Sequence, residues 1–203
     1  MLALHAYDVE QQRIVADVRE PMLAEIRLAW WREQVEALVG GKPAPAQPIL
    51  RALEAHALGV DLVALTPIEE GFVPLLTPGP LVPLDLAAAR GAPLFRCLLT
   101  AILARPLTNP EAAAAASAGT RWALARLWRG GWGHAEPRLQ GLQPPAFPDF
   151  PPTGLRPSAL PPALAALDAL AADDWRRLEA GAPLARAASP ARQWRMARAA
   201  LRS

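Results

Sequence analysis

The chain has 203 residues, of which 52% are apolar and 20% are charged. This length suits one domain, or one domain with a tail, and so large an apolar share excludes wholesale disorder. A single cysteine excludes an internal disulfide and a cysteine-built metal site. We expect no membrane-spanning segment and no secretory signal, because the apolar runs are short and residues 1–6 have no basic start. These features favour the cytoplasm.

Charge is distributed unevenly along the sequence. Residues 1–100 carry 8 basic and 12 acidic side chains, whereas residues 101–203 carry 13 basic and 7 acidic ones. All but one of the basic residues are arginine. Such an asymmetry is typical of a C-terminal half that meets an acidic partner or an anionic membrane.

Proline and glycine divide the N-terminal half into helix-length segments, none with the alternating pattern of a β-strand. Pro21 suits the first turn of a helix that stops at Gly40. Thr66 and Glu69 have the spacing of a capping box, which predicts a short helix beginning there. Longer helices are expected at residues 5–19, 21–40 and 48–58.

The C-terminal half continues the helical pattern. A helix at residues 84–105 is expected to break or kink at Gly91 to Pro93. Thr108 and Glu111 form a second capping box, which opens the clearest helix of the chain. Further helices are expected at residues 108–129, 161–180 and 190–201.

Seven prolines fall within residues 133–157, a density that no regular element tolerates. The sequence therefore predicts an all-α protein with three parts. Residues 1–132 form a helical domain, residues 133–157 form a proline-rich linker or surface arm, and residues 158–203 form helices that pack on the domain or extend it.

Common catalytic and metal-binding motifs are missing from the sequence. The three histidines lie far apart, and none has a second ligand at metal spacing, so we assign no metal. Cys97 has no nearby histidine to activate it and fits a small core residue. The glycine-rich residues 130–133 follow a helix rather than a strand, which excludes a usual phosphate loop. Asp173 and Asp174 are interpreted as part of a solvated helix face, since neighbouring helix residues point about 100° apart.

The segment from Pro21 to Gly41 is unusually apolar. It carries two helical stripes, which together cover more than half of the helix circumference, so the helix is expected to be buried or to line a cavity. Arg27 lies on the side of the second stripe, four residues before Trp31. It either pairs with a glutamate such as Glu20 or Glu33, or faces an anionic ligand at the edge of an apolar pocket. The stripes consist of Leu23, Ile26 and Trp30, and of Leu28, Trp31, Val35 and Leu38.

The same segment resembles a known family. Ala6-Tyr7, Arg13-Ile14-Val15 and the run E-P-M-L-A-E-I-R-L-A-W-W-R that starts at Glu20 are similar to the second-helix region of squalene/phytoene synthase-like proteins. Within that family, the chain looks most like the subgroup of the mitochondrial complex I assembly factor and its bacterial relatives. The resemblance is clear over residues 2–42, weaker over 84–128 and faint over 189–201.

This resemblance implies an isoprenoid-synthase-like helical bundle, truncated because the chain starts within what resembles the second helix. The family's enzymes join two prenyl diphosphates head to head, using Mg²⁺ ions that two acidic clusters hold. Here the first cluster falls on Gln12, Arg13 and Ala16, with Asp17 the only nearby acid, and a fixed cation at Arg13 repels Mg²⁺. The second would fall on residues 121–129, which contain no acid.

Two functions remain open from this comparison. In the first, the protein has lost its magnesium-diphosphate chemistry, needs no cofactor, and binds either a respiratory-complex subunit or an apolar lipid or isoprenoid ligand. In the second, it is an active prenyltransferase. It then either uses Mg²⁺ as a cofactor or binds the diphosphate through arginines in place of the metal. That version requires Arg13, Arg27, Arg121 and Arg126 to converge on one cavity. The candidate pocket residues are Tyr7, Gln12, Arg13, Asp17, Arg27, Trp31 and Arg121.

The C-terminal helix is basic and amphipathic. Arg192, Arg195 and Arg202 share one side, and Trp194 and Leu201 share another. Such a helix fits an anionic membrane or an acidic partner, with Arg198 added to the basic group, and would place the protein at the periphery of the inner membrane. The alternative is a solvated basic face beside a packed apolar seam. Nucleic-acid binding is not expected, since the arginines are interspersed with acids along most of the chain.

Overall fold

The computed structural model describes residues 2–17, 19–56, 60–129, 144–148, 160–185 and 189–201. All regular elements within these ranges are helical, which confirms the all-α prediction. The α-helices are α1 (Leu2–Asp17), α2 (Pro21–Val39), α3 (Pro48–His56), α4 (Pro83–Leu103), α5 (Asn109–Trp128), α7 (Pro162–Glu179) and α8 (Pro190–Ala200). Two 3₁₀-helices, η1 (Leu62–Gly71) and η2 (Val73–Leu75), link α3 to α4.

Proline and capping signals place most helix starts correctly. Proline stands in the first turn of α2, α4, α5, α7 and α8. At α5 the capping box is present: the Thr108 hydroxyl accepts from the Glu111 backbone N–H, and the Glu111 carboxylate accepts from the Thr108 N–H. The glycine stop after α5 and most of the proline-rich segment 133–157 lie outside the described residues.

Two local predictions were wrong. Thr66 caps no helix, because it lies inside η1 and its hydroxyl donates to the Val63 carbonyl at 2.9 Å. Of the break or kink predicted at Gly91 to Pro93, the break is absent, since α4 continues through both residues. Pro93 is accommodated within the helix, and Gly91 serves a packing role described below.

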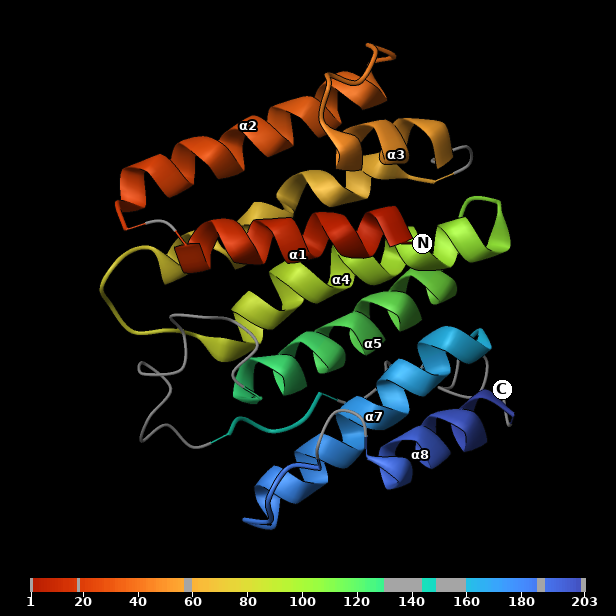
Figure 1. Cartoon of the computed structure of the whole chain (residues 1–203). Coiled ribbons are helices and arrows are strands. Elements are labelled where there is room, and N and C mark those ends of the chain that lie inside the picture. The colour runs from red at the N-terminus through yellow and green to blue at the C-terminus, as the bar shows by residue number, and fades with distance from the viewer. Residues whose placement is uncertain are drawn as a thin grey trace.

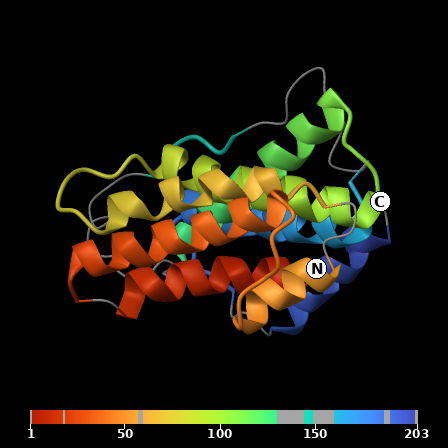
Figure 2. The same ribbon diagram turned by 90° about the horizontal axis from the view of Figure 1, so that it is seen from above.

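The helices stack side by side in the order α2, η1, α4, α5, α7, α8 (Figure 1). Viewed from above, α1 and η1 lie on opposite sides of α2 (Figure 2). The described part of the proline-rich segment, residues 144–148, packs on the last helices through Phe147, whose ring stacks on Trp175 with centroids 5.1 Å apart. Chain order and spatial order therefore nearly coincide, so α2 and α8 form opposite edges of the stack.

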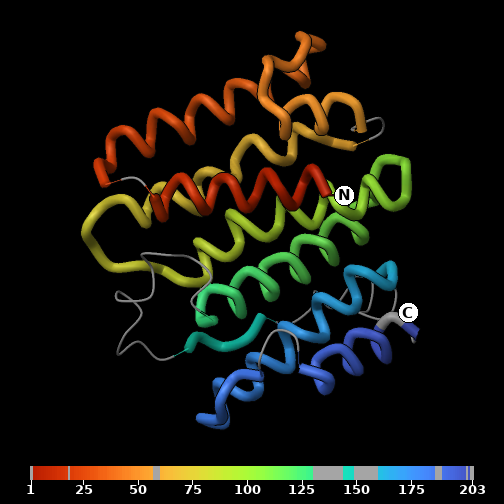
Figure 3. The backbone as a smooth tube through the Cα atoms, in the orientation of Figure 1, coloured from red at the N-terminus to blue at the C-terminus, as the bar shows by residue number. Residues whose placement is uncertain are grey.

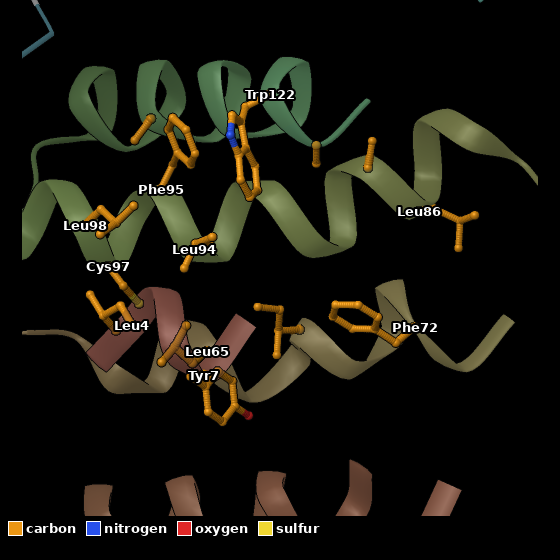
Figure 4. Close-up of a cluster of buried hydrophobic side chains, with 14 of the residues drawn as sticks. Leu4, Tyr7, Leu65, Phe72, Leu86, Leu94, Phe95, Cys97, Leu98 and Trp122 are labelled. Carbon is orange, nitrogen blue, oxygen red and sulfur yellow. The ribbon is translucent and has the colours of Figure 1, made fainter. Parts of the chain in front are cut away.

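Helices α4 and α5 run side by side (Figure 3), and their backbones come into close contact at Gly91 and Gly119. A methyl group added to Gly119 would lie 2.0 Å from the Gly91 carbonyl oxygen, and one added to Gly91 would lie 1.9 Å from the Gly119 oxygen. Only glycine at both positions permits this approach. Next to this glycine contact, Phe95 of α4 packs against Trp122 of α5 with ring centroids 5.5 Å apart (Figure 4).

Helix α4 is long and apolar enough to cross a bilayer by length and composition alone. This corrects the expectation that no segment reaches that length. Of its most apolar 18-residue window, 61% is buried inside the fold, and core helices of soluble proteins pass the same test.

We expect Gly119→Ala to destabilise the fold by about 3 kcal/mol, the upper part of the range for overpacked cores, because its methyl group meets rigid backbone. Gly40→Ala is the matched control: its methyl group would meet backbone oxygens at an ordinary 3.5 Å, and its φ is −75°. Urea unfolding of both variants measures the difference. Equal free energies of unfolding for the two variants would show that the backbones of α4 and α5 do not approach this closely.

Candidate functional site

A fully buried ion pair joins α1 to α4. Arg90 donates from Nε to Asp8 Oδ1 at 2.7 Å and from Nη2 to Asp8 Oδ2 at 2.9 Å, and neither side chain is exposed at all. Asp8 faces inward because it lies one helical turn after Leu4, which is buried on the same face of α1. This bidentate geometry is the strongest form of a guanidinium–carboxylate contact.

The Arg90 guanidinium also organises its surroundings. Its Nη2 donates to Gln12 Oε1 at 3.3 Å, and the group lies 5.1 Å from the ring centre of Phe72 and 5.5 Å from that of Trp122. Arg126 also contacts Trp122: its guanidinium is 5.2 Å from the centre of the same ring. Gln12 thus adds a third hydrogen bond to the buried guanidinium, beside the two that Asp8 accepts.

This arrangement has a chemical consequence. The carboxylate of α1 that points into the core is paired through both oxygens with a permanent cation, whose positive charge would repel Mg²⁺ from that position. Within the described ranges, no three His, Cys, Asp or Glu side chains gather closely enough to hold a metal ion.

A second buried polar group lies between α1, α2 and η1. Tyr7 packs edge-on against Trp31 at 5.6 Å, and burial followed by the charge of Glu69 raises the Tyr7 pKa above its ordinary value. Glu69 accepts a hydrogen bond from Arg32, and burial raises its pKa despite that contact. The Gln11 amide is buried nearby along α1 with no hydrogen-bond partner among the described residues. Tyr7 and Trp31 are therefore core residues rather than walls of an open pocket.

The other predicted pocket residues lie elsewhere. Arg13 and Asp17 pair with each other at 3.0 Å on the exposed side of α1. Arg27 lies 3.9 Å from Glu10, so it pairs with a glutamate, though not with either one expected. Arg121 pairs with Asp168 of α7 at 2.9 Å and lies over the Phe147 ring.

The prediction that four arginines converge on one cavity was wrong. Arg13 and Arg27 are largely exposed on the first two helices, Arg121 is engaged with α7, and Arg126 lies beside Trp122. Spacing along the sequence could not reveal this, because the packing of distant segments decides which carboxylate or aromatic ring each guanidinium meets.

The structure does contain an arginine-lined cavity, in a different place. Between α5, α7 and α8 lies a cavity of about 310 Å³. Its walls carry Arg126, Arg129, Arg192 and Asp174, together with the apolar residues Trp122, Ala125, Leu167, Leu170 and Ala171.

The aspartates of α7 are buried, which corrects their assignment to a solvated face. Asp174 is 1% exposed and accepts from Arg129 at 3.0 Å and from Arg192 at 2.6 Å, both on the same oxygen. Asp173 is 5% exposed and accepts from Arg195 and from Arg177.

Helix α8 consequently turns its basic side toward α7, whereas that side was expected to face outward. Arg192 and Arg195 point inward to the α7 aspartates, so neither is available to a membrane or an acidic partner. Trp194 and Leu201 were expected either to face a membrane or partner or to form a packed seam. They are 68% and 84% exposed, so they do not form a packed seam. Arg198 is exposed, as expected, and Arg202 lies outside the described residues.

Sequence reasoning overlooked the central residue, Arg90. The only signal was its isolation: Arg90 is a lone charge between Leu86 and Leu94 on an otherwise apolar stretch of helix. A charge in such a position needs a buried partner, but nothing in the sequence identifies Asp8, 82 residues away, as that partner.

No protein-family model matches this chain, and neither a curated protein nor a solved structure matches it significantly.

Breaking the central ion pair tests its role. We expect Asp8→Ala to destabilise the protein by about 3–5 kcal/mol, because it leaves a buried cation unpaired. The double variant Asp8→Leu, Arg90→Met should lose much less than the sum of the single changes, as measured by urea unfolding. The exposed pair supplies the control: Asp17→Ala should cost less than about 1 kcal/mol. Additive losses at Asp8 and Arg90 would contradict the pairing.

Asp168 should titrate unusually high. Burial raises its pKa from 3.8 to about 6, although Arg121 opposes the shift. The folded protein then holds this proton more tightly than the unfolded chain, so its contribution to stability is present below about pH 4 and is lost as the pH rises through 6. Relative to Asp168→Asn, the wild type should lose about 2–3 kcal/mol over that interval in urea unfolding. A difference that does not change with pH would refute the shift.

Proposed function

We propose that this protein is a non-catalytic relative of the squalene/phytoene synthases that acts by binding, as an assembly factor for a subunit of a respiratory complex. The observation that carries the proposal is the buried Asp8–Arg90 pair. It occupies the inner face of α1, the helix that resembles the family's metal-binding region, with a cation of the protein's own. A helical bundle with this pair has a packed interior. At this position it would lack the free carboxylates that hold Mg²⁺, and with them the Mg²⁺ that binds a diphosphate.

An exposed apolar stripe on α2 supports a binding role. Trp31 and Val35 on the inner side are buried, whereas the other predicted stripe lies on the surface, contrary to the expectation that both would be covered. Its members lie on one side of the helix at spacings of three and four, and Ile26 is 58% exposed. Exposed apolar side chains that line up in this way mark interaction sites. We call Met22, Leu23, Ile26 and Trp30 the α2 stripe.

The charges around the α2 stripe indicate what covers it. Glu25 and Glu33 are exposed beside it, while the neighbouring Arg27 is already close to Glu10. An acidic rim disfavours an anionic membrane and favours a polypeptide whose apolar helix face is flanked by basic residues. The partner proposed is therefore a helical segment of a respiratory-complex subunit with that composition.

The alternative function is head-to-head condensation of prenyl diphosphates. It requires a site for Mg²⁺ or a convergence of arginines at the positions that resemble the family, and the geometry around Asp8 and Arg13 supports neither. The binding role is favoured for that reason.

The test replaces the native gene in its own cells with an Ile26→Glu variant. A charge within the α2 stripe should lower the amount of assembled respiratory complex several-fold on native gels, without unfolding the variant. Val63→Glu is the matched control, because Val63 is 55% exposed on η1 and the substitution is the same in kind.

Two results would overturn the proposal. One is an unchanged amount of every respiratory complex in cells with the Ile26→Glu protein. The other is a condensed product when the purified protein is incubated with Mg²⁺ and farnesyl or geranylgeranyl diphosphate.

A further inference from the structure

The cavity between α5, α7 and α8 carries an excess of positive charge. Three guanidinium groups face one carboxylate, that of Asp174. Arg129 and Arg192 share a single oxygen of that carboxylate, so their guanidinium groups are held next to each other. Each guanidinium has five N–H donors, and these contacts use only part of them. Two adjacent, pre-oriented guanidinium groups match the oxygens of a phosphate.

Arg126 contributes a third cation with no carboxylate partner among the described residues. Its Nε is buried and makes no hydrogen bond there, while its guanidinium group lies over the Trp122 ring. Burial, and then the neighbouring charge of Arg90, lower the Arg126 pKa. A buried donor without an acceptor is costly, and an anion in the cavity would supply one.

The remaining walls are apolar. Trp122, Leu167 and Leu170 line the same space, and its volume of about 310 Å³ lies at the lower end of the range for small-molecule sites. A ligand that fills it therefore has a charged end and a short apolar end.

We propose that this cavity binds a phosphomonoester with an apolar substituent, without a metal ion. Its phosphate contacts Arg126, Arg129 and Arg192, and its substituent lies against Trp122 and Leu170. At neutral pH such a phosphate carries about two negative charges, which balance the excess of three guanidinium groups over one carboxylate. The site is independent of the α2 stripe, which lies at the opposite edge of the helix stack (Figure 1).

Calorimetric titration of the purified protein with hexyl phosphate, in buffer containing EDTA, tests the proposal. We expect saturable binding that weakens at least about tenfold in Arg126→Gln, because one charged contact to the phosphate is lost. Arg13→Gln is the matched control and should bind as the wild type does, since Arg13 is an exposed arginine on α1. Leu167→Trp, which fills the cavity from its partly exposed rim, should also abolish binding without changing any charge.

Two further arms identify the source of the phosphate. Inorganic phosphate should bind more weakly than hexyl phosphate, because it leaves the apolar wall uncovered. Vesicles containing phosphatidic acid should be bound, with the same dependence on Arg126, if the ligand is a lipid headgroup, and should not be bound if it is a free phosphomonoester. Absence of hexyl phosphate binding, or equal affinities in wild type and Arg126→Gln, would overturn the proposal. Equal affinities for inorganic and hexyl phosphate would overturn the role of the apolar wall.

Discussion

The rest of the structure depends on the ion pair between Asp8 and Arg90. It connects the first helix of the chain to the central helix α4 and lies between the rings of Phe72 and Trp122, where water does not reach it. Removing either partner would leave an isolated charge in that environment, so α1 and α4 have one workable relative position. The guanidinium of Arg90 also positions two further residues. It donates a hydrogen bond to Gln12, and it lies against the Trp122 ring that Arg126 contacts.

Arginine–carboxylate pairs recur at the other helix interfaces. Arg32 of α2 meets Glu69 of η1, Arg121 of α5 meets Asp168 of α7, and Arg195 of α8 meets Asp173 of α7. Two of the helices that these pairs join, α5 and α7, are rich in alanine, whose small side chains form shallow ridges and leave neighbouring helices free to slide. The planar, directional guanidinium removes that freedom, which lysine would do less well. The abundance of arginine in the sequence thus has a structural use.

These pairs also explain which features could be predicted. Helix starts depend on local chemistry, so Pro21, Thr108 and Pro190 located three of them from sequence alone. The site depends on contacts between distant residues, and the rule that apolar faces turn inward failed at α8. There the buried aspartates of α7 pair with Arg192 and Arg195, so the helix turns its basic side inward and leaves Trp194 exposed. The residue pattern of α8 alone cannot show that buried aspartates lie on the neighbouring helix α7.

A fixed guanidinium differs from a metal ion in one way that bears on function. A metal can leave with its substrate, whereas Arg90 stays in the core and places a permanent positive charge beside Trp122. Arg126 lies against the same ring, and the repulsion between the two cations contributes to the lowered pKa of Arg126. An anion in the neighbouring cavity would relieve that repulsion. The fixed charge of Arg90 in the interior would therefore also strengthen the attraction of the cavity for a phosphate, because both arginines lie against the same indole ring.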